Sequence, residues 1–167
     1  MFILKPNKLL FKNFSAFLAL GFGSGLIKKA PGTFGTLVAI PFFLFLQLLS
    51  QPFIYLFIIT FFFIGIYVAD KTSQALAMKD PSCIVIDEIV GFLMLLTLIG
   101  SLLGTGISIT KIDFTLAFIL FRIFDIWKPF PIDLLEKKFR GGFGIMIDDI
   151  GAAIYAYIIF ILIHYAI

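Results

Sequence analysis

The sequence predicts an all-α fold, an integral membrane bundle of about five spanning helices with a short re-entrant or interfacial helix near the amino terminus. Of its 167 residues, 61% are hydrophobic and only 14% are charged, whereas soluble domains are roughly 45–50% apolar and 25% charged. The mean hydropathy is +1.12. The apolar residues also form long charge-free runs, as in helices that cross a bilayer. The length suits one membrane-embedded domain, residues 1–167, in which residues 1–12 form a basic arm.

The first two runs predict a helical hairpin. Residues 34–50 and 53–69 carry no charged side chain, and Gln51 and Pro52 join them at a helix-breaking turn. Each run has 17 residues. At a rise of roughly 1.5 Å per residue each would measure about 25 Å, which spans the hydrocarbon core only with little tilt.

Three further spans are expected, at about residues 84–103, 112–127 and 150–167. Residues 13–27 are also apolar, but they are few and are interrupted by three glycines. We therefore expect them to form a re-entrant or interfacial segment, and the sequence leaves open whether they cross the membrane.

The basic residues predict the orientation. If Phe34 lies on the cytoplasmic side, eleven of the thirteen Lys and Arg residues lie on that side, whereas the reverse orientation places the same eleven outside. Lys111 falls in an outer loop and Arg122 within the fourth span. The eleven are Lys5, Lys8, Lys12, Lys28, Lys29, Lys71, Lys79, Lys128, Lys137, Lys138 and Arg140. They are spread over loops and the amino-terminal arm, which does not indicate nucleic-acid binding.

The same topology gathers five acids from three helices at the cytoplasmic face: Asp87, Glu88, Asp125, Asp148 and Asp149. A charged carboxylate within a bilayer costs on the order of 3 kcal/mol, so such residues usually face a partner, water or a metal. The nearby cations are too few to neutralise five acids. Oxygen ligands without Cys or His suit Mg²⁺, which we expect to be held by Asp87, Glu88, Asp148 and Asp149.

Simpler interpretations of these charges remain open. The paired acids could offset helix dipoles at helix amino termini. Arg122 and Asp125 could be only an intramembrane ion pair three residues apart. Lys128 could be an interfacial anchor beside Trp127.

A glycine-rich stretch, GFGSGLIKKAPGTFGT at residues 21–36, could bind an anionic headgroup through backbone N–H groups and hydroxyls. Its candidate substrate-binding residues are Ser24, Gly25, Thr33 and Thr36. It is neither a Walker P-loop nor a dinucleotide-binding fingerprint, and it could equally be a flexible turn.

Several enzyme classes are excluded at the acidic site. The one histidine, His164, falls on the far face, so a histidine nucleophile or a Ser-His-Asp triad is not available there. The one cysteine, Cys83, lacks the arginine six positions later that a cysteine-based phosphatase loop would need. Carboxylates, a cation, Mg²⁺ and an anion-binding loop remain, and they indicate phosphoryl chemistry on a lipid headgroup.

Four blocks resemble the phosphatidylglycerophosphatase A family: GFGSGL with PGTFGT, IDEIVG (86–91), FRIFDIWKPFPI (121–132) and GGFGIMIDDI (141–150). They occur in the family's order between residues 21 and 151, most of the chain. The resemblance implies an all-helical, Mg²⁺-dependent membrane phosphatase that converts phosphatidylglycerol phosphate to phosphatidylglycerol and phosphate. We expect it in the bacterial cytoplasmic (inner) membrane, with its active site on the cytoplasmic face.

In the resulting hypothesis the catalytic residues are Asp125, Asp149, Arg122 and Lys128. Asp125 is a further metal ligand or orients water, while Arg122 and Lys128 bind phosphate oxygens together with the glycine-rich loop. The sequence leaves open direct water attack or a covalent aspartyl-phosphate, one metal or two, the oligomeric state, and tolerance for other lipid phosphates.

Two other function classes are alternatives. A small cation transporter would also hold intramembrane acids, but nearer the midplane and open to both faces. A lipid-binding protein without catalytic activity would explain the basic loops, but it would not need paired acids. A phosphatidyltransferase would share Mg²⁺ and carboxylates, but its D-G-x-x-A-R type of spacing does not occur here.

Overall fold

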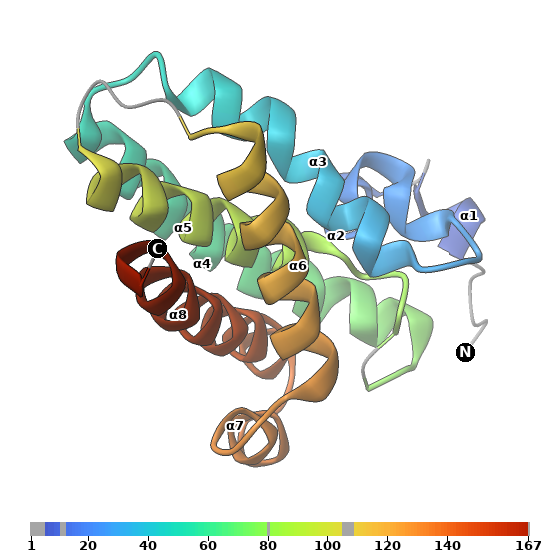
Figure 1. Cartoon of the computed structure of the whole chain (residues 1–167). Helices are drawn as coiled ribbons and strands as arrows, with labels where there is room; N and C mark the ends of the chain where they lie inside the picture. Colours follow the sequence, from blue (N-terminus) through green and yellow to red (C-terminus); the bar gives the residue numbers. More distant parts are fainter. Residues whose placement is uncertain (1–5, 11–12, 80, 105–108, 167) are drawn as a thin grey trace.

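The computed structural model describes residues 6–10, 13–79, 81–104 and 109–166, and this part of the chain is helical without a strand. Most of the predicted basic arm, residues 1–5 and 11–12, lies outside the described residues. In chain order the helices are α1 (Pro6–Leu10), α2 (Phe14–Ala19), the 3-10 helix η1 (Gly21–Leu26), α3 (Pro31–Leu46), α4 (Gln51–Leu76), α5 (Ile86–Leu103), α6 (Lys111–Trp127), α7 (Ile132–Lys138) and α8 (Gly142–Ala166) (Figure 1).

Helix α5 forms the centre of the bundle and packs against α3, α4, α6 and α8 (Figure 1). It is apolar on all sides, as expected for a helix enclosed by other helices. Its Phe92 is fully buried and contacts the rings of Phe114, Phe118 and Phe121 on α6. Close packing around α5 therefore fixes the position of the acids at its start.

The helices have the properties of a membrane bundle. Three of them, α4, α5 and α8, are long and apolar enough to cross a membrane, and α3 is a shorter apolar helix. Large apolar side chains face outward from the bundle, among them Leu48, Phe53, Phe63 and Leu162, each at least 60% exposed. In water such a surface would be unfavourable, whereas against lipid it costs little. The predicted all-helical membrane fold is confirmed. A helix occupies each of the five predicted runs, and among the described helices α4, α5 and α8 have the length and composition of a span.

Several helix boundaries differ from the prediction. Helix α3 begins and ends three to four residues earlier than predicted, and Gln51 and Pro52, predicted as the turn, begin α4, since proline is tolerated in the first turn of a helix. Two differences are larger. Helix α4 continues to Leu76, seven residues past the predicted end, and α8 begins at Gly142 instead of Ile150. The prediction ended each span at the first charge, but a helix can continue beyond the hydrocarbon region. Asp148 and Asp149 are therefore the seventh and eighth residues of α8 and do not open the helix.

Residues 13–27 form two short pieces, α2 and η1, of six residues each. An α-helix of six residues measures roughly 9 Å, which is too short to cross a bilayer. This agrees with the predicted short amino-terminal segment.

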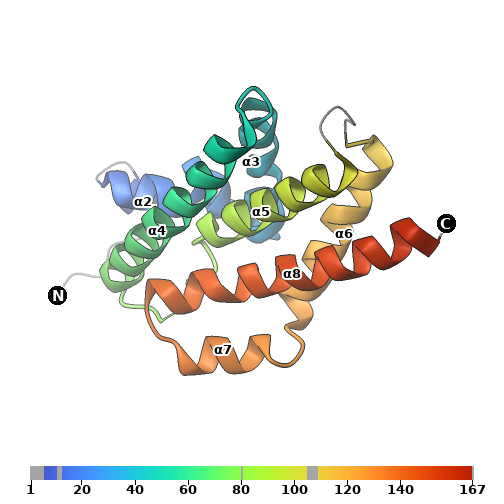
Figure 2. The same ribbon diagram turned by 90° about the vertical axis from the view of Figure 1, so that its left-hand side faces the viewer.

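Connected helices run in opposite directions, so the starts of α5 and α8 and the ends of α4 and α6 meet at one end of the bundle. Figure 2 shows the end of α4 and the start of α8 at this end of the bundle on the left, with α7 beneath the start of α8, and the carboxy terminus on the right. We call it the acidic end, because Asp87, Glu88, Asp125, Asp148 and Asp149 all lie there.

Candidate active site

Three carboxylates from two helices converge at the acidic end. Asp87 and Glu88 occupy the first turn of α5, and Asp149 lies on α8. Each offers an oxygen, and these oxygens all lie within 4.8 Å of one another. Asp149 is only 2% exposed. The structure thus brings together three of the four predicted metal ligands, which we call the acid triad.

Each member of the acid triad has a buried oxygen without a hydrogen-bond partner in the described structure: Asp87 Oδ1, Glu88 Oε2 and Asp149 Oδ2. A buried carboxylate oxygen without a partner is costly, and three close together also repel one another. A hard divalent cation would satisfy all three, since such cations prefer oxygen ligands. The donor set therefore fits the predicted Mg²⁺, with no Cys or His in this group to favour zinc.

Gly91 lets α5 and α8 approach closely behind the acid triad. A Cβ at this position would lie 3.0 Å from both Cβ and the carbonyl oxygen of Asp149, and 3.1 Å from the ring of Phe121. Any side chain would therefore push α8 away from α5. Gly91 was not among the predicted site residues, although a glycine inside an apolar helical run is a signal of close packing.

Arg122 and Asp125 form an ion pair beside the acid triad. Arg122 Nη1 lies 2.5 Å from Asp125 Oδ2 and 3.9 Å from Glu88 Oε1, and Nε is buried without a hydrogen-bond partner in the described structure. Asp125 also lies against Asp149. The predicted ion pair is therefore present, and it is joined to the acids, as a catalytic role for both residues would require.

The start of α3 packs directly against this pair. A Cβ at Gly32 would lie 3.0 Å and 3.1 Å from the two terminal nitrogens of Arg122 and would also clash with Glu88. Only a residue without a side chain fits there. Gly32 belongs to the glycine-rich stretch but was not among the predicted binding residues.

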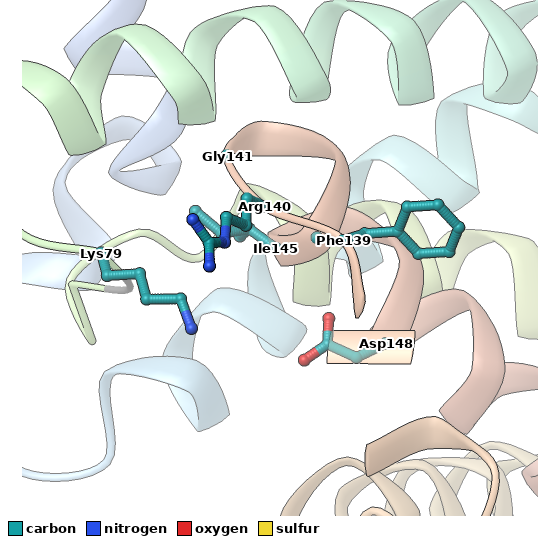
Figure 3. Close-up of a pocket in the computed structure, with 7 residues that line it drawn as sticks. Lys79, Phe139, Arg140, Gly141, Ile145 and Asp148 are labelled. Atoms are coloured by element: carbon teal, nitrogen blue, oxygen red, sulfur yellow. The ribbon is translucent and has the colours of Figure 1, made fainter. Parts of the chain in front are cut away.

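Lys128 and Asp148 form a second ion pair, with 2.5 Å between Lys128 Nζ and Asp148 Oδ2. Asp148 Oδ1 accepts a hydrogen bond of 3.1 Å from the backbone N–H of Asp149. Asp148 was predicted as a metal ligand, but it is not in the acid triad; its carboxylate also lines a small pocket (Figure 3). Consecutive helical residues point about 100° apart, which is why the two aspartates have different neighbours.

The four predicted loop residues have different surroundings. The hydroxyls of Ser24 and Thr36 donate to backbone carbonyls of Gly21 and Gly32, each at 2.8 Å. Gly25 packs against the carbonyl of Cys83, where a Cβ would clash. Thr33, in the first turn of α3, is partly exposed. Their binding roles stay predictions; Ser24 and Thr36 already donate their hydroxyl protons within the protein.

A residue without a sequence signal holds the start of α8. Asp70 Oδ1, from α4, accepts a hydrogen bond of 3.2 Å from the N–H of Gly142. This contact satisfies one of the N–H groups that a helix start leaves unpaired. Asp70 was not predicted, because a cap supplied by another helix has no local sequence pattern.

Comparisons with known proteins indicate the family of the chain. The family model described as phosphatidylglycerophosphatase A matches residues 17–164, which include every acid of the acidic end. The chain belongs to the phosphatidylglycerophosphatase A family. No solved structure matches it. The predicted family resemblance is confirmed.

Three relatives are similar over most of their length. "Phosphatidylglycerophosphatase A" of Haemophilus influenzae is 45% identical over 149 residues, 89% of this chain and 87% of the relative. The Escherichia coli protein of the same name is 38% identical over 82% of this chain and 76% of its own. A Bacteroides thetaiotaomicron protein, whose name proposes a phosphatidylinositol-3-phosphatase, is 37% identical over 85% of this chain and 88% of its own. Family and apolar helices together indicate a bacterial membrane protein.

Proposed function

We propose that the chain hydrolyses the terminal phosphomonoester of phosphatidylglycerol phosphate, with Mg²⁺, at the cytoplasmic face of the bacterial inner membrane. The products are phosphatidylglycerol and inorganic phosphate. Family membership and the two relatives named for this activity support the reaction. The observation that carries the metal-assisted mechanism is the acid triad, with its three buried oxygens that have no partner in the described structure.

Asp87, Glu88 and Asp149 would hold the Mg²⁺. When bound, Mg²⁺ supplies charge neutralisation at phosphate oxygens and makes a bound water more acidic. The carboxylates would hold it at the end of the bundle, where the headgroup of a lipid substrate could reach it without leaving the bilayer.

Arg122 binds the non-bridging oxygens of the phosphomonoester. Its guanidinium group suits this role because it is planar and always charged, and because its buried Nε has no partner in the described structure. Asp125 holds Arg122 in place and orients the attacking water. The water oxygen bonds to phosphorus, the phosphorus–glycerol oxygen bond breaks, and the glycerol oxygen takes up a proton.

The distribution of charge supports a cytoplasmic active site. Described basic residues near the acidic end include Lys28, Lys29, Lys79 and Lys138, whereas Lys111 starts α6 at the opposite end. Positive charge concentrates on cytoplasmic loops of membrane proteins.

The arrangement of the acids does not favour the transporter alternative. They lie in the first turn of α5, at the seventh and eighth residues of α8 and in the last turn of α6, not halfway along these helices. A carrier that exposes its site to both faces needs acids near the midplane.

The test is phosphate release from phosphatidylglycerol phosphate by the purified full chain in detergent. We expect EDTA to abolish activity, Mg²⁺ to restore it, and Asp149→Asn to lower kcat on the order of 10²-fold or more, the size of loss when one electrostatic contact to a transition state is removed. Asp113→Asn is the matched control, because Asp113 lies at the start of α6, far from the site, and Asn keeps an acceptor oxygen for Thr110. Activity that survives both EDTA and Asp149→Asn contradicts the metal mechanism.

A further inference from the structure

A small pocket lies at the start of α8, next to the acid triad. It has a volume of about 70 Å³ and is lined by Asp148 of α8, Lys79 of the α4–α5 connection and Arg140 of the α7–α8 connection. Figure 3 shows Lys79 and Arg140 on one side of the pocket and the Asp148 carboxylate on the other. The proposed mechanism gives no role to Lys79 or Arg140.

The charges around this pocket favour an anion. Its charged lining side chains, among the described residues, are Lys79, Arg140 and Asp148. The Asp148 carboxylate lies 2.5 Å from the ammonium group of Lys128, so that pair is close to neutral. Asp70 of α4 lies against Gly141 of the lining and adds one negative charge. Lys79 and Arg140 together still leave a net positive charge around the pocket, and two cations that face one small space are stabilised by an anion between them.

The size and position of the pocket restrict which anion it takes. One water molecule needs about 10–15 Å³ of cavity volume, and the pocket has about 70 Å³. It can therefore hold a few waters or one phosphate, but not an acyl chain. Lys79 and Arg140 are exposed and lie in connections outside the spanning helices. A free, water-soluble phosphate can reach this side, whereas the phosphodiester of a lipid is tied to acyl chains within the bilayer.

We propose that Lys79 and Arg140 form a binding site for inorganic phosphate on the water side of the active site, which receives the phosphate released by hydrolysis. The assignment of that phosphate as the reaction product rests on the proposed function. The route is short, because Asp148 in the pocket and Asp149 in the acid triad are consecutive residues of α8. Lysine and arginine bind phosphate through charge-assisted hydrogen bonds.

The experiment is a titration of inorganic phosphate followed by ³¹P NMR line broadening, on the full chain in uncharged detergent, at low salt and with EDTA. EDTA prevents metal-dependent phosphate binding at the acid triad. We expect wild-type protein to bind phosphate, and Lys79→Gln/Arg140→Gln to raise the Kd about tenfold or more, the loss expected when charge-assisted hydrogen bonds are removed. Lys138→Gln should leave the Kd unchanged, because Lys138 is an exposed cation of the same end that does not line the pocket.

A competition distinguishes the two sources of phosphate. Phosphatidylglycerol added to the micelles should not displace inorganic phosphate; displacement would assign the pocket to the lipid phosphodiester and overturn the proposal. Equal Kd values for wild type and the double variant would overturn it as well. Because no turnover occurs in this titration, a chain that binds phosphate here but releases none from phosphatidylglycerol phosphate refutes the proposed function, not the phosphate site.

Discussion

The contact between α5 and α8 at Gly91 gives the sharpest test of how the fold positions the acid triad. In Gly91→Ala the new methyl group would lie 3.0 Å from Cβ of Asp149, whereas ordinary contacts begin at about 3.4 Å. The α8 backbone must therefore move by several tenths of an ångström, and Asp149 moves with it. Since a misplacement of 1 Å can cost about 10²-fold in rate, we expect kcat to fall about tenfold. Overpacking typically lowers the free energy of unfolding by about 1–3 kcal/mol, and the better helix propensity of alanine offsets up to about 1 kcal/mol of this loss.

Gly100→Ala is the matched control, because Gly100 lies on the same helix and a Cβ there would have only Ile109 nearby, at 3.9 Å. Both variants should be assayed for phosphate release and for thermal unfolding in detergent. We expect Gly100→Ala to keep wild-type kcat and to unfold at the same or a higher temperature. Wild-type kcat in Gly91→Ala would refute the argument that close approach at this glycine sets the acid geometry.

Three further predictions concern the charges of the site. Asp70→Ala should destabilise the protein by about 1 kcal/mol through loss of the cap on Gly142, seen as a lower unfolding temperature, whereas Asp70→Asn should largely preserve stability because its oxygen can still accept the hydrogen bond. Arg122→Lys should raise KM for phosphatidylglycerol phosphate about tenfold with little change in unfolding temperature, because lysine keeps the charge but loses the planar donors; an unchanged KM would contradict phosphate binding by Arg122. Mg²⁺ at about 100 times its Kd should stabilise the wild type by roughly 2.7 kcal/mol. The unfolding temperature of Asp149→Asn should rise less on addition of Mg²⁺ than that of the wild type. In EDTA the variant should be the more stable of the two, because one of the mutually repelling carboxylates is gone. Equal rises in unfolding temperature with Mg²⁺ would contradict binding at the acid triad.

The sequence was sufficient to place the helices and to bring the acids to one end. Charge-free runs bounded by polar or helix-breaking residues identify spans, and antiparallel succession then fixes which ends meet. Asp87, Glu88 and Asp149 could therefore be grouped from the alternating direction of the helices alone. The reasoning needs only the order of the helices, not their packing.

The pairing of side chains could not be predicted in the same way. Whether Asp148 faces the triad or Lys128 depends on the rotation of α8, and each residue turns the side chain by about 100°. This rotation is set by close packing at glycines such as Gly91 and by the cap from Asp70, contacts between residues far apart in the chain. The short helix α7 was missed too, because its seven residues, Ile132–Lys138, are too few for a periodic pattern to stand out.

The charge balance of the site explains why the metal and the basic residues belong together. Five acids of the acidic end face two cations, Arg122 and Lys128, among the residues discussed, so the formal charge is −3. One bound dication would reduce it to −1, and a phosphomonoester dianion would still be repelled. Metal and phosphate are therefore expected to favour each other's binding, by the same factor in both directions. After hydrolysis the active site is still negative, whereas the pocket beside it is positive. Electrostatics therefore favours movement of the released phosphate from the active site to Lys79 and Arg140.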